Sequence, residues 1–283
     1  MQSYSIFLVT RRPSTGMIRI LFLGQKWLGE RCFDILQKLQ SDSVCICGVV
    51  SNSSTEVWWQ TNTIYQRCLS TGIPLIANDK RNDAAIVSMI AEMNVNTIIS
   101  VQHPWIIPQE SISLVNDRAF NLHNARLPTY RGHNACNHAI LNGDQYYTST
   151  LHWMVAEVDA GAIAFEETVE VAPDDTARSL YEKAIESGQM VFQRLLSHLM
   201  QRQPIPHKPI SGTGVLYSRN SLDHFREIRD ITNPEEVDRK SRALFFPPFE
   251  PAYYRLSGKK HYVLPANFHV FAHEFKASSS YLT

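Results

Sequence analysis

The sequence predicts an α/β fold with a Rossmann-like core, a mostly parallel sheet and a small C-terminal α+β subdomain. Short β-rich runs alternate with helical stretches over the first two thirds of the chain, which is typical of a parallel sheet with helices on its faces. The chain has 283 residues, 44% of them hydrophobic and 19% charged, so it is long enough to bury a large core and lacks the composition of a disordered protein.

The alternation begins with a strand at residues 17–24 and a helix at 26–39. After residue 145 two consecutive strands and one long helix replace it, and Thr176 is a plausible cap of that helix. A proline-rich linker at 202–210 then leads to a helix at 234–244 and a hairpin at 252–264. The remaining expected strands are 44–50, 73–77, 97–101, 119–123, 148–154 and 162–171, and the remaining helices are 63–70, 84–93 and 176–200.

The chain divides into three expected parts. Residues 1–16 are expected to be a disordered leader, because a short apolar run precedes Arg11 and Arg12, the reverse of a signal peptide, and Met17 is a candidate natural start. We expect the catalytic domain at 17–202, and the linker with the small subdomain at 203–283. The apolar C-terminal hairpin is a reasonable surface for a homodimer.

Composition argues against several classes of partner. Lys plus Arg number 27 and Asp plus Glu number 27, so no global positive field would hold nucleic acid. No apolar stretch approaches the roughly 18 residues of a membrane span. The five cysteines are odd in number and scattered, which favours reduced thiols and a cytoplasmic location.

Chemistry-bearing residues concentrate at the end of the strand 119–123. Asn121 and His123 are two positions apart and therefore share one face of the sheet, at the carboxyl end where open α/β sheets bind ligands. A carboxamide beside an imidazole can polarise a carbonyl and move a proton. By itself an Asn-x-His sequence is more often a turn with a structural histidine, but a second polar segment follows with His152 and Asp159.

Two other kinds of site are less favoured. Several histidines lie close to Asp159 in sequence, but neither H-E-x-x-H nor C-x-x-C occurs, so we expect no metal. Gly24 and Gly29 after the first strand form only part of a dinucleotide-binding glycine motif. His152, beside Trp153 on an apolar strand, is expected to be a core or pocket-wall residue.

Residues NLHNARLPTYRG, then HAILNGD and TLHWMVAEVDAGAIAFEE, closely resemble the folate-dependent formyltransferases. That family has the pattern N-x-H-x-x-L-L-P-x-[YF]-[RK]-G followed by H-x-x-x-x-x-x-D-x-G, and Asp159 follows His123 by the family's 36 positions. The resemblance covers roughly residues 17–200. The chain departs from it at Asn124 and Ala125, where Pro-Ser is common, which leaves the three polar residues intact.

The resemblance implies an enzyme that takes a formyl group from 10-formyltetrahydrofolate, with Asn121, His123 and Asp159 as its catalytic set. Asn121 would stabilise the developing oxyanion, His123 would move the proton, and Asp159 would orient His123. The folate would lie against two segments of backbone. Its expected contacts are Pro104, Trp105, Ile106, Ile107, Met154, Val155 and Val158.

The C-terminal extension bears on the acceptor amine. The tRNA-modifying members need a basic C-terminal domain, and the glycinamide ribonucleotide enzyme stops soon after the long helix, so the extension most resembles that of sugar N-formyltransferases. The implied acceptor is a nucleotide-linked 3- or 4-amino-dideoxyhexose, with dTDP as the expected carrier, for O-antigen or other surface polysaccharide. Another small amine, or a catalytically silent binding protein on the same fold, are the alternatives. Expected acceptor contacts are Arg131, His133, Asn134, Trp153, Phe246 and Tyr253. Phe245, Phe246 and Tyr253 could stack on the base, and Arg242 and Lys259 are candidates for the diphosphate.

Overall fold

The computed structural model describes residues 16–54, 57–59 and 63–274. Its centre is a seven-stranded sheet of order β3-β2-β1-β4-β5-β7-β8, in which the first five strands are parallel, β7 runs antiparallel to them and β8 runs antiparallel to β7. This arrangement confirms the Rossmann-like core with a mostly parallel sheet. The strands are β1 (Ile18–Gly24), β2 (Val44–Ser51), β3 (Leu75–Ala77), β4 (Thr97–Val101), β5 (Ala119–His123), β7 (Tyr146–Trp153) and β8 (Ile163–Glu170).

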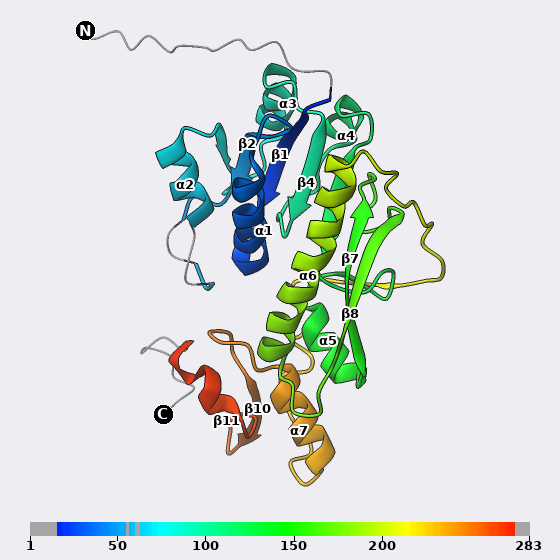
Figure 1. Ribbon diagram of the computed structural model, residues 1–283. Coiled ribbons are helices and arrows are strands. Elements are labelled where there is room, and N and C mark those ends of the chain that lie inside the picture. The colour runs from blue at the N-terminus through cyan, green and yellow to red at the C-terminus, as the bar shows by residue number, and fades with distance from the viewer. Residues whose placement is uncertain (1–15, 55–56, 60–62, 275–283) are drawn as a thin grey trace, which may run out of the picture.

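Helices cover both faces of this sheet (Figure 1). Apolar side chains of α1, α2 and α6 form one core cluster with the strands, and those of α3 and α4 form another on the opposite face. Alternate residues of each buried strand enter alternate clusters, as the twofold period of a strand requires. The helices of the core are α1 (Lys26–Leu39), α2 (Thr63–Thr71), α3 (Asp83–Glu92), α4 (Gln109–Leu114), α5 (Ala135–Asn142) and α6 (Ala177–Met200).

The long helix α6 begins where the sequence predicts. Thr176 accepts a hydrogen bond from the backbone of Ser179 at 3.1 Å, and the Ser179 hydroxyl accepts from the backbone of Thr176 at 2.9 Å. This reciprocal capping box satisfies two amide groups that a helix N-terminus otherwise leaves unpaired. Thr176 is therefore the predicted cap, and α6 runs the length of the sheet (Figure 1).

The C-terminal part contains the predicted helix and hairpin, and it packs against the core. Asn137 on α5 donates to the Ala243 carbonyl at 2.8 Å, and Arg178 on α6 pairs with Glu274 at 2.5 Å. A short parallel pair, which the sequence reasoning missed, ties residues 215–217 to the loop after β5. The elements are β6 (Tyr130–Gly132), β9 (Val215–Tyr217), α7 (Pro234–Ala243), β10 (Ala252–Leu256), β11 (Lys259–Val263) and the 3-10 helix η1 (Phe268–Glu274).

The expected leader falls at residues 1–15 outside the described part of the chain, so its expected disorder and the start at Met17 stay predictions. The boundaries 17–202 and 203–283 stay predictions as well. Across residues 16–54, 57–59 and 63–274, every helix is too short or too polar to cross a bilayer.

Candidate active site

The candidate site lies where β5 ends beside the antiparallel strand β7. β5 and β7 are antiparallel neighbours, and their register places Asn121 opposite His152. Ala119, two residues before Asn121, enters the cluster beneath α3 and α4, which places Asn121 and His123 towards that same face. Their common face, expected from spacing alone, therefore points away from α6.

Asp159 joins these side chains into one network. Its Oδ1 accepts from Asn121 Nδ2 at 3.4 Å and lies 3.5 Å from His152 Nε2. Its Oδ2 lies 3.5 Å from His123 Nδ1 and accepts the backbone N–H of Gly132 at 3.0 Å. Each carboxylate oxygen thus faces one histidine and one N–H donor. The structure brings together all three residues expected to be catalytic.

The hydrogen bonds of His123 and His152 determine which nitrogen of each ring carries the proton. His123 Nε2 lies 2.6 Å from the Tyr130 carbonyl, which can only accept, so Nε2 carries the proton and Nδ1 is the basic nitrogen. His152 Nδ1 likewise donates to the Trp153 carbonyl at 2.9 Å, which leaves Nε2 to accept from Asn121 Nδ2 at 3.0 Å. His123 therefore presents its basic atom to Asp159.

Burial and charge oppose each other in this network. Burial lowers the pKa of His123 below its ordinary value, although Asp159 acts in the other direction, so the ring is neutral near pH 7. Burial alone would raise the pKa of Asp159, but His123, His152 and the N–H of Gly132 outweigh it and hold that pKa well below its usual range. A neutral base beside a carboxylate can take a proton and be stabilised by the charge it then faces.

The local backbone explains why the turn contains Asp-Ala-Gly. Asp159 has a φ of 50°, in the left-handed region that aspartate tolerates better than most residues. A Cβ at Gly161 would lie 1.8 Å from the Trp153 carbonyl, so no larger residue fits there. Asp159 is thus presented by a turn that packs directly on the end of β7.

The two segments expected to contact folate meet at one apolar cluster. Ile107 and Met154 both pack in the cluster beneath α3 and α4, and the Met154 amide donates to the Ala119 carbonyl at 2.8 Å. Ile106 is 52% exposed and Val155 is 44% exposed, so each segment also presents apolar surface. The remaining expected contacts are Pro104, which is half-buried, Trp105, which is partly exposed, and Val158, whose carbonyl accepts from Arg131 at 2.9 Å.

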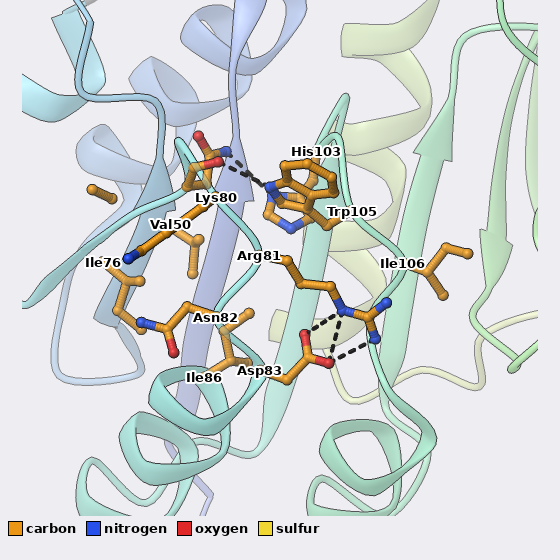
Figure 2. A pocket seen from close by; sticks show the side chains of 12 residues that line it. Val50, Ile76, Lys80, Arg81, Asn82, Asp83, Ile86, His103, Trp105 and Ile106 are labelled. Atoms are coloured by element: carbon orange, nitrogen blue, oxygen red, sulfur yellow. Dashed lines mark hydrogen bonds and ion pairs between the residues drawn. The ribbon is translucent and has the colours of Figure 1, made fainter.

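A cavity adjoins the first of these segments, at the carboxyl ends of β2 and β3 (Figure 2). Trp105 and Ile106 line it, and Trp105 donates to the Asn78 carbonyl at 2.9 Å. Asn78 Nδ2 donates to His103 Nδ1 at 3.4 Å, yet Asn78 Oδ1 and His103 Nε2 are buried without a hydrogen-bond partner among the described residues. Burial lowers the pKa of His103 to about 4, so its ring is neutral. A ligand with one donor and one acceptor would satisfy both atoms.

The residues expected to contact the acceptor are scattered. Arg131 binds the segment after β7, through Glu157 at 2.8 Å and Val158, and Asn134 binds the loop after β9. Trp153 lies on the opposite face of the sheet from Asn121, with its ring 4.5 Å from that of Phe120. His133 follows Gly132 and is exposed beside the network.

The aromatic candidates of the C-terminal part also separate. Phe246 is half-buried, and its ring contacts the rings of Trp58 and Tyr181. Tyr253 lies on β10, with Lys260 Nζ 4.1 Å from its ring centre, and its described contacts are within that part of the chain. Phe245 is fully buried, so its expected stacking on a base is wrong. Arg242 is paired with Asp238 at 2.9 Å, and Lys259 is exposed on the hairpin.

Sequence reasoning undervalued His152 and missed Tyr130 and Gly132 as parts of the network. His152 lies opposite Asn121 because β7 pairs antiparallel with β5 in this register, which no local pattern predicts. Tyr130 and Gly132 act through their backbone, which leaves no signal in the side chains. The described residues contain no group of three or more His, Cys, Asp or Glu side chains arranged to hold a metal ion.

Comparison with known proteins now adds to this geometry. The model of the formyl transferase family matches residues 18–196, well over half of the chain. The chain belongs to the formyl transferase family. The match contains every residue of the network around Asp159 and ends within α6.

Individual members of the formyl transferase family resemble the chain to different extents. It is 32% identical over 173 residues to a GDP-perosamine N-formyltransferase of Brucella melitensis, a match that covers 61% of this chain and 66% of the relative, just under two thirds of its length. A 4-N formyltransferase of Francisella tularensis has the same fold, with a TM-score of 0.72 at 17% identity over 88% of this chain and 97% of its own. A Helicobacter canadensis N-formyltransferase in complex with folinic acid and dTDP-3-aminofucose aligns with a TM-score of 0.67 at 18% identity over 86% of each chain.

Proposed function

We propose that the protein is a sugar N-formyltransferase, which moves the formyl group of 10-formyltetrahydrofolate to the amine of a nucleotide-linked aminodeoxysugar. The observation that supports this most directly is the convergence of Asn121, His123 and His152 on Asp159 at the carboxyl end of β5. The relatives named above as N-formyltransferases support the same reaction.

The reaction sets three tasks for the side chains. The acceptor amine forms a bond to the formyl carbon, the bond from that carbon to the folate N10 breaks, and one proton passes from the amine to N10. A negative charge develops on the formyl oxygen while the carbon is tetrahedral. The site must stabilise this charge, move the proton and keep both substrates in place.

Asn121 is the donor proposed for the oxygen. Its Nδ2 donates to His152 at 3.0 Å and more weakly to Asp159 at 3.4 Å. The longer bond is the one that the formyl oxygen would replace, whereas His152 keeps the amide oriented. One fixed donor of this kind stabilises a developing oxyanion by about 3 kcal/mol.

His123 is the group proposed to move the proton. Its neutral Nδ1 can accept the proton from the attacking amine, because Nε2 is already donating to the Tyr130 carbonyl. The ring then carries a positive charge 3.5 Å from Asp159 Oδ2, which stabilises it. The same Nδ1 can return the proton to N10 of the folate as that bond breaks.

The folate would bind between the segments 104–107 and 154–158. Exposed Ile106 and Val155 offer apolar surface to a flat heterocycle, and the backbone of both segments offers hydrogen bonds to its edge. The complex of the Helicobacter canadensis relative with both folinic acid and dTDP-3-aminofucose supports this choice of formyl donor.

The carrier nucleotide differs between the relatives. The Brucella relative is named for a GDP-linked sugar and the Helicobacter relative binds a dTDP-linked sugar, so the expected dTDP preference becomes one arm of a test. We place the reaction in the cytoplasm and in surface polysaccharide assembly, and a homodimer through the C-terminal subdomain remains a prediction.

The test is incubation of the protein with 10-formyltetrahydrofolate and a panel of GDP- and dTDP-linked 3- and 4-amino sugars, followed by mass spectrometry. We expect a gain of one formyl group on at least one sugar, with equal release of tetrahydrofolate. No formylated sugar from any carrier would overturn the acceptor. Formylation of a small amine outside the panel would favour the first alternative, and nucleotide binding without turnover the silent binding protein.

A further inference from the structure

We infer that Lys26, His133 and Arg219 bind the diphosphate of the nucleotide-linked sugar, and that its base stacks on the aromatic group around Trp58 and Phe249. The inference rests on the proposed function and adds the residues that recognise the carrier. Lys26, His133 and Arg219 are called the cationic cluster below, and Trp58, Phe246 and Phe249 the aromatic group.

The pairing of β6 with β9 brings two members of the cationic cluster together. Gly132 lies opposite Tyr217, and the His133 amide donates to the Tyr217 carbonyl at 3.0 Å. The side chain of the next residue, Asn134, donates from Nδ2 to the Arg219 carbonyl at 3.0 Å and fixes the backbone there. His133 and Arg219 thus emerge side by side from segments more than eighty residues apart.

Lys26 comes from the third segment, directly after β1 at the start of α1. Its φ of 61° is in the left-handed region, which a lysine rarely adopts, and its side chain is half-buried. Burial first, and the charge of Arg219 second, lower the pKa of Lys26 to about 8. Arg219 and Lys26 both lower the pKa of His133 in addition to burial. The three groups therefore lie within electrostatic reach of one another.

Lys26 and Arg219 carry the positive charge of the cluster near pH 7, whereas the lowered pKa of His133 leaves its ring a neutral hydrogen-bonding group. No ion pair with Asp or Glu joins Lys26, His133 or Arg219 in the described part of the chain, whereas other basic residues such as Arg67 and Arg178 pair with carboxylates. Lys26 is half-buried and Arg219 is exposed, so burial and the nearby guanidinium both disfavour the charge on Lys26, and a bound anion would offset this. A diphosphate supplies two negative charges and several oxygens that accept charge-assisted hydrogen bonds from Lys and Arg.

The aromatic group lies next to the cationic cluster. Lys26 Nζ lies 5.9 Å from the ring centre of Trp58, which in turn lies 5.7 Å from Phe249 and 5.3 Å from Phe246. Phe249 is 46% exposed, so one ring of the group is open to a ligand. Aromatic rings of this kind stack on a nucleobase, with about 1 to 3 kcal/mol per base.

The order of these features matches the order of groups in a sugar nucleotide. His133 is the neighbour of Gly132, whose N–H binds Asp159, so the cationic cluster begins beside the network that would act on the amine. Lys26 follows, and Trp58 lies beyond it. Aminosugar, diphosphate and base would then occupy the Asp159 network, the cationic cluster and the aromatic group in turn.

The test measures nucleotide binding and kinetics in two single variants, Arg219→Gln and Lys26→Met. Calorimetry measures the affinity of each variant for GDP and dTDP in the absence of the sugar. Steady-state kinetics with the aminosugar nucleotide that the panel identifies measures KM and kcat. Each variant loses a charge-assisted contact, so we expect affinity to fall and KM to rise about tenfold, with kcat changed less than about twofold. Raising the ionic strength should increase the wild-type KM and affect the variants less.

Arg202→Gln is the matched control. Arg202 is exposed just after α6, beside Gly16 that precedes β1, and so lies at the amino end of the parallel strands, away from the site at their carboxyl ends. It should keep wild-type affinity and KM, and thermal melts should show that all three variants fold.

The outcomes separate this inference from the proposed function. Wild-type formylation of a sugar nucleotide with unchanged KM and affinity in both variants overturns the cationic cluster and leaves the proposed function standing. Nucleotide affinity that depends on Arg219 and Lys26, in a protein that formylates no sugar, supports the cluster and overturns the function.

Discussion

The network around Asp159 and the cationic cluster lie side by side but are built in opposite ways. In the network, each oxygen of Asp159 has a donor, and both histidines have a fixed carbonyl partner. In the cluster, Lys26 and Arg219 form no ion pair in the described part of the chain, although Lys26 is half-buried beside Trp58. The first region is complete without a ligand, and the second requires an anion to offset its charges.

This difference suggests a division of work between the two regions. A network whose atoms are already oriented loses little on binding and can act in the transition state, so it should govern kcat. Charges without partners gain their partners from the ground-state substrate, so they should govern KM.

The largest effect is expected from Asp159→Asn. The amide would direct its NH2 group either towards Gly132 and His123 or towards Asn121 and His152, and it would remove the charge that stabilises protonated His123. We expect kcat to fall roughly 10³- to 10⁴-fold, as for other variants with a misoriented catalytic histidine. Steady-state kinetics at saturating sugar nucleotide checks this. A large rise in KM with kcat near the wild-type value would break the division.

A smaller loss is expected from Asn121→Ala. The variant removes the donor proposed for the formyl oxygen and leaves His152 Nε2 without its partner at 3.0 Å. We expect kcat to fall about 10²- to 10³-fold, with the affinity for GDP or dTDP unchanged. Single-turnover rates with both substrates bound measure this step. Activity within about threefold of wild type would exclude Asn121 as the oxyanion donor.

The pH profile sharpens the role of His123. Its pKa is lowered by burial, so the basic, neutral form persists below the ordinary value of 6.5. Asp159 stays ionised over the same range because its pKa is held down. We expect kcat to be flat above the lowered pKa of His123 and to fall about tenfold per pH unit below it. A kcat that rises as the pH falls would mean that the protonated ring is the active form.

The smallest effect concerns the support of the cationic cluster. His138 is buried, stacks on Tyr217 at 3.8 Å and bonds with Ser221 at 2.8 Å, and burial lowers its pKa to about 4. The folded state therefore binds fewer protons than the unfolded state between about pH 6.5 and pH 4. Stability should fall as the pH drops through this window, by about 1.4 kcal/mol per unit from this residue.

His138→Gln removes that titration, so urea unfolding of the variant should show a shallower loss of stability towards pH 4. The comparison needs only the difference in slope between the two proteins, because other histidines contribute equally to both. Identical slopes would mean that His138 does not hold residues 217–221 through its neutral ring.

The sequence predicts much of the fold because its signals are local. The alternation of buried strands with helices, the cap at Thr176 and the proline-rich linker each depend on neighbouring residues, and the predicted elements agree with the structure. The common face of Asn121 and His123 could also be predicted, because residues two positions apart on a strand point to the same side of the sheet. The role of Asp159 came from the family spacing, and the structure now places it between both residues.

Contacts between distant segments could not be predicted in this way. The pairing of β6 with β9 involves only three residues on each side, too few for a periodic pattern, yet it delivers Arg219 to His133. Trp58 gains its partners from α6 and from the C-terminal part. The sequence-based candidates for the nucleotide were chosen from one segment, which is why Phe245 proved to be buried and Arg242 paired.

The division between the two regions is tested most directly by measuring kcat and KM for His123→Gln and Arg219→Gln beside the wild type, with 10-formyltetrahydrofolate and the sugar nucleotide that the panel identifies. We predict that His123→Gln loses kcat by at least about 10²-fold at nearly constant KM, and that Arg219→Gln raises KM about tenfold at nearly constant kcat. The same pattern of change in both variants, or wild-type kcat in His123→Gln, would contradict the account.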